Sequence, residues 1–226
     1  MDSVKRLFDI PHYQLEKFPQ EVALAGKINN QWKTYSTKEY IEAANAISRG
    51  LLKLGIQPGD KIAVISHNNR PEWNIMDIGV LQIGAVNVPV YPTISESDYK
   101  FIFNDSEVKL CFVSNDELFE KVNHIIGEVP SLTSIYSFLP VEGCKSWNEV
   151  LELGKDESGQ SEVEALKEKV DPMDLATLIY TSGTTRLPKG VMLSHNNIVS
   201  NCKASIERLP TDHTAIGLSF LPVCHV

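Results

Sequence analysis

The residues best suited to chemistry lie together in one stretch, residues 181–190, which reads TSGTTRLPKG. Small residues let backbone amides approach an anion closely, and the hydroxyl groups of Ser182, Thr184 and Thr185 can donate hydrogen bonds to phosphate oxygens. Lys189 adds a positive charge. These residue types at this density indicate a loop that binds the phosphates of a ligand.

A Walker A loop is the first comparison, because it also combines glycines with a lysine. That motif has glycine directly before its lysine and serine or threonine directly after it. Here Pro188 precedes Lys189 and Gly190 follows it, so the Walker A motif is absent. On composition alone, a turn rich in glycine and threonine that binds no ligand is the alternative.

The neighbouring segments would hold this loop between two strands. Residues 176–180, ATLIY, are typical of a buried strand and lead directly into the loop. A second apolar run, VMLS at residues 191–194, follows the loop, and a helix is expected to begin at Ser194 or His195. The sequence thus predicts a strand, loop, strand and helix in succession, with His195 as a helix-start residue.

Upstream of this unit, short apolar strands alternate with helices that begin at capping residues. After a hairpin from Val22, strands are expected from Lys61, Ala85 and Leu110, and helices at Ser36 (ending at Gly55), at Asn68–Pro71, at Ser95 and at Ser114. Such apolar strands suit a mostly parallel sheet, so the pattern predicts a layered α/β fold with helices on both faces. Pro89 indicates that its strand is irregular or lies at an edge. Ligands of such sheets bind at the carboxyl ends of the strands.

The polar, charged segment at residues 154–171 is the best candidate for a boundary within the chain. Its second half has the pattern of a solvated helix, and an acidic interaction patch is the alternative use of the segment. The expected division is a first α/β subdomain at residues 1–170, followed at residues 171–226 by the loop and the start of a second subdomain.

The overall composition disfavours several classes of protein. With 29 acidic and 21 basic residues, the net charge of −8 argues against nucleic-acid binding. No apolar run approaches the roughly 18 residues of a membrane span, and the first residues lack the apolar core of a secretory signal. The four cysteines lie far apart and form no CxxC pair, which is typical of reduced thiols in a cytoplasmic protein.

Residues 180–195, YTSGTTRLPKGVMLSH, resemble the phosphate-binding signature of adenylate-forming (AMP-binding) enzymes. This superfamily includes acyl-CoA synthetases, luciferases and peptide-synthetase adenylation domains, and its pattern is Tyr-Thr-Ser-Gly-Thr-Thr-Gly, any residue, then Pro-Lys-Gly. Residues 34–66, 68–93 and 220–226 agree with the family in order and spacing. Their motifs RPEW, VPVYPT and LPVCHV are most similar to those of long-chain fatty acyl-CoA ligases.

The resemblance implies both a fold and a reaction. The fold would be the N-terminal portion of the large domain of an acyl-CoA synthetase. The reaction would join a fatty acid to ATP, giving an acyl-adenylate and pyrophosphate, after which coenzyme A displaces AMP to give a thioester. No protein nucleophile is required, since positioning and charge neutralisation drive the first step.

The resemblance also assigns site residues by their positions in the motif. Those that would wrap the β- and γ-phosphates of ATP are Thr181, Ser182, Gly183, Thr184, Thr185 and Lys189. Thr181 would also lie near a Mg²⁺ ion. His225 would be the catalytic residue near the reacting carboxylate, with a packed or exposed histidine as the alternative. ATP, Mg²⁺ and coenzyme A are thus the expected cofactors and co-substrates.

Two features depart from the family. Arg186 stands where the family has glycine, and a side chain there is expected to weaken nucleotide binding if the backbone must adopt positive φ. Family members are also much longer. The chain is therefore expected to be an N-terminal fragment of a ligase that lacks the C-terminal part of the enzyme and is inactive alone.

Two other functions stay open at this stage. One is an adenylating ligase for another carboxylate, such as an aryl, short-chain or amino acid. The other is a non-catalytic nucleotide-binding module, which the short chain and Arg186 favour. A fatty acid and coenzyme A are the expected small-molecule partners, and the sequence is compatible with peripheral membrane contact and with a homodimer formed through apolar edges.

Overall fold

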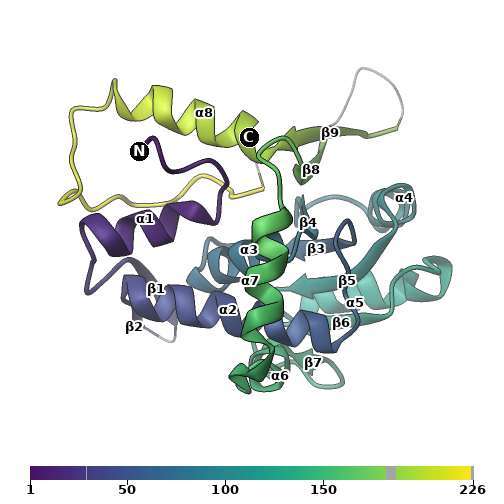
Figure 1. Cartoon of the computed structure of the whole chain (residues 1–226). Helices are drawn as coiled ribbons and strands as arrows, with labels where there is room; N and C mark the ends of the chain where they lie inside the picture. Colours follow the sequence, from purple (N-terminus) through teal and green to yellow (C-terminus); the bar gives the residue numbers. More distant parts are fainter. Residues whose placement is uncertain (29, 182–186, 225–226) are drawn as a thin grey trace.

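The structure, a computed structural model, describes residues 1–28, 30–181 and 187–224, and Figure 1 shows helices packed around a central sheet. The helices are α1 (Asp9–Lys17), α2 (Thr37–Lys53), α3 (Pro71–Gln82), α4 (Glu96–Ser106), α5 (Asp116–Ile125), α6 (Trp147–Leu153), α7 (Gln160–Lys169) and α8 (His195–Ile206). The strands are β1 (Leu24–Ile28), β2 (Gln31–Tyr35), β3 (Lys61–Ile65), β4 (Val86–Val90), β5 (Val108–Val113), β6 (Ser134–Ser137), β7 (Lys145–Ser146), β8 (Leu175–Thr181) and β9 (Lys189–Ser194). None of the described helices is long and apolar enough to cross a membrane.

Seven strands form one sheet in the order β7-β6-β5-β3-β4-β8-β9, while β1 and β2 pair as a separate antiparallel hairpin. All neighbours in the large sheet run parallel except β8 and β9. The chain adds β4 on one side of β3 and then crosses back to add β5 and β6 on the other side. The predicted α/β fold with a mostly parallel sheet is therefore confirmed.

Helices cover both faces of this sheet because the apolar side chains of each strand point alternately to opposite sides. In β3, Ile62 and Val64 pack in a cluster with residues of α2, α3, α6 and α7. The intervening Ala63 and Ile65 pack on the other face with residues of α4 and α5. The continuous apolar run of the sequence thus corresponds to a strand that is buried on both sides.

Five helices, α2, α4, α5, α6 and α8, begin at side-chain caps, and one of these caps differs from the sequence-based expectation. Ser36 Oγ accepts a hydrogen bond from the Glu39 amide at 3.2 Å, and Glu39 Oε2 accepts one from the Ser36 amide at 2.7 Å, as predicted for a capping box. The prediction that Ser114 caps α5 was wrong, because Asn115 is the cap. Ser114 Oγ instead accepts a hydrogen bond from the backbone of His67 at 3.3 Å, which joins the loops after β3 and β5.

Of the two expectations for Pro89, an irregular strand or an edge strand, the edge position was wrong, because β4 lies between β3 and β8. Pro89 pairs in register with Val64 of β3. On the other side, β4 and β8 share a single register pair, Asn87 with Thr177. Pro89 lies two residues beyond that single pair, where no further register pair joins the described residues of β4 and β8.

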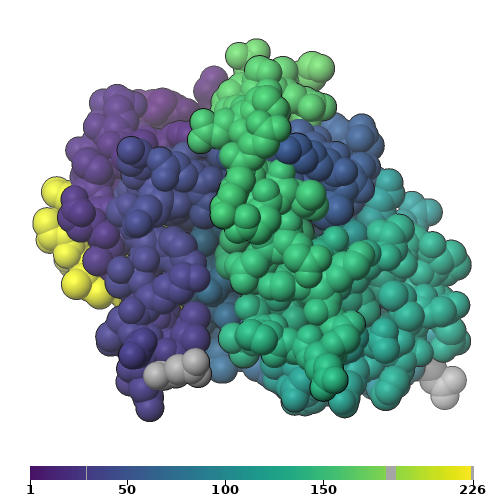
Figure 2. Space-filling view, turned by 90° about the horizontal axis from the view of Figure 1, so that it is seen from below, coloured from purple at the N-terminus to yellow at the C-terminus, as the bar shows by residue number. Residues whose placement is uncertain are grey.

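The polar segment before β8 contains the expected helix, α7, and Figure 2 shows it as a green ridge across one face of the molecule. The segment is fixed to α2 at Gly154, where a Cβ atom would lie 1.7 Å from the carbonyl oxygen of Ala46. Arg49 Nε donates a hydrogen bond to the Gly154 carbonyl at 2.7 Å. Glycine at this position therefore allows the chain to cross α2 in direct backbone contact.

Candidate functional site

The loop that is predicted to bind phosphate connects β8 to β9, at the edge where the parallel strands end. β8 runs parallel to β4, so its last residue, Thr181, lies at the carboxyl end where ligands of such sheets bind. β9 returns antiparallel, and Thr181 pairs with Lys189 across the hairpin. Both residues are exposed. The fold thus brings a hydroxyl and an ammonium group to the two ends of one short connection.

Thr181 and Lys189 are therefore the predicted site residues that the structure brings together. The others, which lie outside the described residues, are Ser182, Gly183, Thr184, Thr185 and His225, together with Arg186. Within the described part of the chain, Lys189 takes part in none of the salt bridges, so its charge is available to an anionic ligand. The hydroxyl oxygen of Thr181 is a hard ligand of the kind that Mg²⁺ accepts.

Two residues inside the hairpin hold it in place. The hydroxyl of Tyr180 donates a hydrogen bond to Asp105 Oδ2 in α4 at 2.5 Å. Burial, with this hydrogen bond, raises the pKa of Tyr180 well above its usual value, so the phenol stays protonated. Across the hairpin, a Cβ atom at Gly190 would lie 3.0 Å from Leu178 Cδ1 and 3.2 Å from Tyr180 Cζ. The sequence-based analysis did not predict the contact between Tyr180 and Asp105. Its one signal was the tyrosine at the end of an apolar strand.

The segment that leads to His225 is held by the side chain of Asn69, in the loop between β3 and α3. Asn69 Nδ2 donates hydrogen bonds to Ser219 Oγ and to the carbonyl of Leu221, both at 2.7 Å. Its Oδ1 accepts a hydrogen bond from the Val223 amide at 3.3 Å. In Figure 1 this tail passes α1 and returns toward the middle of the molecule. The sequence predicted Asn69 only as part of a helix start.

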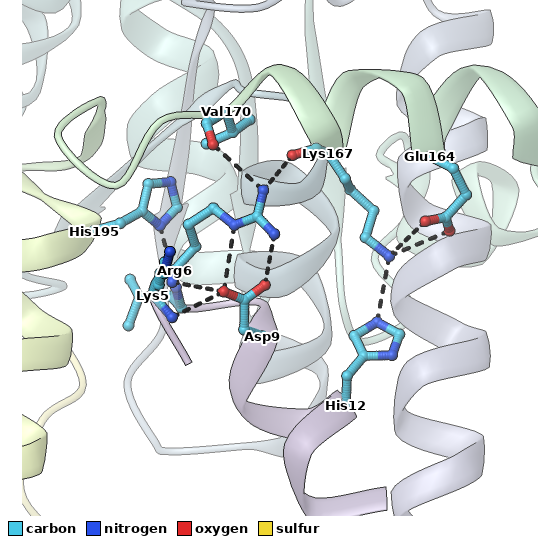
Figure 3. A network of polar contacts seen from close by, with 9 residues as sticks. Lys5, Arg6, Asp9, His12, Glu164, Lys167, Val170 and His195 are labelled. Carbon is cyan, nitrogen blue, oxygen red and sulfur yellow. Dashed lines mark hydrogen bonds and ion pairs between the residues drawn. The ribbon is translucent and has the colours of Figure 1, made fainter. Parts of the chain in front are cut away.

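The N-terminal segment is bound to the end of α7 by a network of polar contacts, which Figure 3 shows. Arg6 forms two side-chain contacts with Asp9, from Nη2 to Oδ1 at 2.9 Å and from Nε to Oδ2 at 3.3 Å. The remaining nitrogen, Nη1, donates to the carbonyls of Lys167 at 2.5 Å and Val170 at 3.4 Å. Arg6 therefore satisfies carbonyls at the end of α7, just before the chain enters β8.

His195 connects the same N-terminal segment to the start of α8, and the prediction that it begins this helix is confirmed. Its Nδ1 accepts a hydrogen bond from the Leu7 amide at 3.2 Å, and its own amide donates to the Asp174 carbonyl at 3.2 Å. The side chain is 1% exposed. Burial, aided by the charge of Arg6, lowers the pKa of His195 to about 4, so the imidazole is neutral at pH 7.

Comparison with known proteins adds a family match to this geometry. A model of the AMP-binding enzyme family matches residues 12–226. The chain is 32% identical over 221 residues to the long-chain-fatty-acid–CoA ligase ACSBG2 of Xenopus laevis, covering 94% of this chain and 30% of that protein. It is 33% identical over 210 residues to the long-chain-fatty-acid–CoA ligase FadD15 of Mycobacterium bovis, covering 92% of this chain and 34% of that protein. The chain thus spans about a third of the length of these curated relatives.

Among solved structures, the anthranilate CoA ligase AuaEII, in complex with anthranoyl-AMP, has the same fold over most of the chain. The TM-score is 0.71 at 21% sequence identity, and the match covers 88% of this chain and 35% of that one. At this level of identity the likeness concerns the fold alone.

We predict that Asn69→Ala releases the tail, because it removes three hydrogen bonds at once. Exchange of the Val223 amide proton should become about fivefold faster or more, the factor that corresponds to a hydrogen bond of about 1 kcal/mol. Hydrogen–deuterium exchange followed by NMR measures this directly. Asn68→Ala is the matched control, because no hydrogen bond joins the Asn68 side chain to the described part of the tail. Equal exchange in the two variants would contradict the assignment.

We also predict that His195 makes the protein less stable in acid. Its folded pKa of about 4 lies below the usual histidine value of 6.5, so the unfolded state binds more protons between these two pH values. The free energy of unfolding therefore decreases as the pH falls from 6.5 to about 4, by up to about 3 kcal/mol. Burial raises the pKa of Asp77 to about 6, so this residue changes the free energy of unfolding with pH in the opposite direction.

The pH test therefore compares wild type with His195→Phe rather than relying on wild type alone. Urea unfolding at neutral and mildly acidic pH should give a smaller acid-induced loss of unfolding free energy in the variant. His124→Phe is the control, because His124 is exposed and lies on α5. The prediction is wrong if His195→Phe and His124→Phe show the same dependence on pH.

Proposed function

Because the chain belongs to the AMP-binding enzyme family, we propose that it is the N-terminal part of an ATP-dependent long-chain fatty acid–CoA ligase. Relatives that are named as such ligases support this substrate class. The observation that carries the proposal is the pairing of Thr181 with Lys189, at the carboxyl end of β8 and at the two ends of the family's phosphate-binding sequence.

In the first proposed step, a carboxylate oxygen of the fatty acid attacks the α-phosphorus of ATP, and the bond to the bridging oxygen of the β-phosphate breaks. The products are an acyl-adenylate and pyrophosphate. Both reactants are anions, so the site has to offset their repulsion. Lys189 would contact the β- and γ-phosphates, with Thr181 near the Mg²⁺ ion, which neutralises the triphosphate when bound. In the second step, the sulfur of coenzyme A attacks the acyl carbon and AMP leaves.

His225 would then lie near the reacting carboxylate. What supports this placement is the neighbouring tail, which Asn69 holds through Ser219, Leu221 and Val223. Asn69 comes from the loop at the carboxyl end of β3, and Thr181 from the carboxyl end of β8, in the same sheet. The two segments that carry candidate residues therefore approach one edge of the sheet.

Exposed apolar side chains support the proposal that this chain is part of a larger enzyme. In β9 the exposed fraction is 68% for Met192, and in the tail the exposed fractions are 100% for Ile216, 82% for Leu218 and 76% for Phe220. Exposed apolar side chains can mark surfaces that another part of a protein covers. We propose that residues 171–226 begin a second subdomain and that the rest of the ligase covers these side chains.

The phosphate-binding role predicts that the chain binds Mg·ATP and that Lys189→Ala weakens this binding about tenfold or more, the effect of losing a charge-assisted hydrogen bond. Calorimetric titration of ATP in the presence of Mg²⁺ measures the affinity. Lys155→Ala is the matched control, because Lys155 is exposed and pairs with Glu152 at 2.6 Å, away from the hairpin. Absence of ATP binding, or equal binding by both variants, would contradict the proposal.

The same titration can be extended to the reaction. We expect no pyrophosphate release when the 226-residue chain is given ATP and hexadecanoate, because it spans only about a third of the ligases it matches. Pyrophosphate release that depends on hexadecanoate would show that this fragment is active by itself, contrary to this expectation.

Arg186 generates a separate prediction, which rests on the family motif because the residue lies outside the described part of the chain. If the loop needs positive φ where the family has glycine, Arg186→Gly removes a penalty of about 1 kcal/mol and tightens ATP binding about fivefold. Arg208→Gly, an equal change in charge at an exposed position, is the control. Unchanged ATP affinity in Arg186→Gly would exclude this reason for weakened binding.

A further inference from the structure

A second concave site lies at the same edge of the sheet, between the carboxyl ends of β3 and β5. The chain leaves β3 toward α3 on one face and leaves β5 toward α5 on the other, so the winding of the sheet reverses between these two strands. Open α/β sheets bind ligands in the crevice at this switch point. Strand β8 lies two strands from β3, roughly 10 Å away at normal strand spacing, so the cleft is separate from the β8–β9 loop.

The cleft has a volume of about 250 Å³ and is lined by segments that are far apart in the sequence. One wall is the loop at residues 66–70 with the start of α3, and the others come from β1 and from Ser114 and Asn115. β1 approaches closely because Gly26 has no side chain; a Cβ atom there would lie 2.6 Å from Pro71 Cδ. The space exceeds the share of one water, about 30 Å³, and approaches the lower limit for small-molecule pockets, about 300 Å³.

Arg70 lines this cleft, and most of its hydrogen-bonding capacity is unused. Its side chain is only 12% exposed, and its Nε donates to Glu72 Oε2 at 3.0 Å. The guanidinium carbon lies 5.0 Å from the centroid of the Phe138 ring, which fixes its plane. Arginine has five N–H donors, and the described residues provide no acceptor for those on Nη1 and Nη2. This planar pair of donors suits a phosphate or carboxylate.

The charges around the cleft leave a positive excess. The carboxylate of Glu72 is 3% exposed and is shared between Arg70 and Lys33, whose Nζ lies 3.5 Å from Oε1. Glu117 lies nearby and pairs with His67 at 3.3 Å and with Lys121 at 2.8 Å. Glu72 is the carboxylate among the residues that line the cleft.

The remaining positive group is Lys27 of β1, which also lines the cleft. In the described part of the chain it forms no salt bridge, in contrast to Lys33 on the paired strand. The residues that line the cleft thus include two cations, Lys27 and Arg70, and one carboxylate, Glu72, which also pairs with Lys33 from outside the lining.

We propose that this cleft binds a small phosphate-bearing ligand, with Arg70 and Lys27 as its anchors. A site of this size holds a phosphate group and a small organic substituent. Free inorganic phosphate and a phosphate monoester offer the same anchoring group, and they differ in whether the rest of the cleft is filled. The proposal concerns a site distinct from the nucleotide site above and does not depend on it.

The test uses NMR titration of the 226-residue chain in the Lys189→Ala background, so that the β8–β9 loop contributes little to phosphate binding. Inorganic phosphate and glycerol 3-phosphate are added separately, and the amide shifts of residues 66–72 and 114–115 are followed. We expect saturable shifts there with both probes, and tighter binding of glycerol 3-phosphate if the ligand is an ester. Lys27→Ala should weaken phosphate binding about tenfold. Arg70→Lys should do the same, because it keeps the positive charge but removes the planar pair of guanidinium N–H donors.

Lys38→Ala is the control, since Lys38 is exposed on α2 and lies outside the cleft. Arg70 pairs with the buried carboxylate of Glu72, so its substitution can also affect folding. Lys27 is exposed, and Lys27→Ala therefore tests phosphate binding without this effect. The proposal is overturned if neither probe shifts the cleft residues, or if Lys27→Ala and Lys38→Ala bind phosphate equally well. A response confined to the β8–β9 loop in the wild-type chain would overturn it as well, while leaving the nucleotide site intact.

Discussion

Strand β8 has a partner on each side, parallel β4 and antiparallel β9, and the geometry of the candidate site depends on that double pairing. The parallel contact places the end of β8 at the carboxyl edge of the sheet, where the fold leaves room for a ligand. The antiparallel contact brings Lys189 back to Thr181. Tyr180, with its hydroxyl on Asp105, then prevents the hairpin from shifting along α4. Thr181 and Lys189, the two ends of the candidate phosphate-binding stretch, are fixed in this way.

Besides this double pairing, the geometry of the candidate site depends on the direction in which the chain enters β8. Arg6 binds carbonyls at the end of α7, and His195 joins the N-terminal segment to the start of α8. These contacts surround the segment between α7 and β8, whose carbonyls at Pro172 and Asp174 accept hydrogen bonds from the first amides of α8. The N-terminal residues are thus part of the support of the site, although they lie more than a hundred positions away in the sequence.

The loop at residues 66–70 has a part in both sites that we propose. Asn69 holds the tail that leads toward His225, while Arg70 lines the cleft between β3 and β5. The loop occupies this position because β3 is the central strand of the sheet and its carboxyl end lies between those of β4 and β5. Both sites that we propose thus lie at one edge of the sheet, on loops whose ends are held by buried strands.

Local sequence patterns were enough to predict the individual elements. Apolar runs specified strands buried on both faces, the Ser36–Glu39 pair specified the start of α2, and the order of residues 180–190 specified the phosphate-binding motif and its family. Interactions within a few residues are enough for each of these features. This is also why the two local errors were small: Ser114 and Asn115 are both good caps, and a proline is tolerated in a central strand where one neighbour pairs only briefly.

Which of these residues come into contact, in contrast, depends on the folded arrangement of the elements. The sequence gives no sign that Asn69 binds the tail at Val223, that Arg6 reaches the end of α7, or that Lys27 and Arg70 line one cleft. Each of these arrangements brings together groups from different elements, and which groups meet depends on strand order and on the face to which each crossover turns. Strand order and crossover direction depend on the apolar surface that the whole sheet buries. A local pattern of residues gives no information about that total.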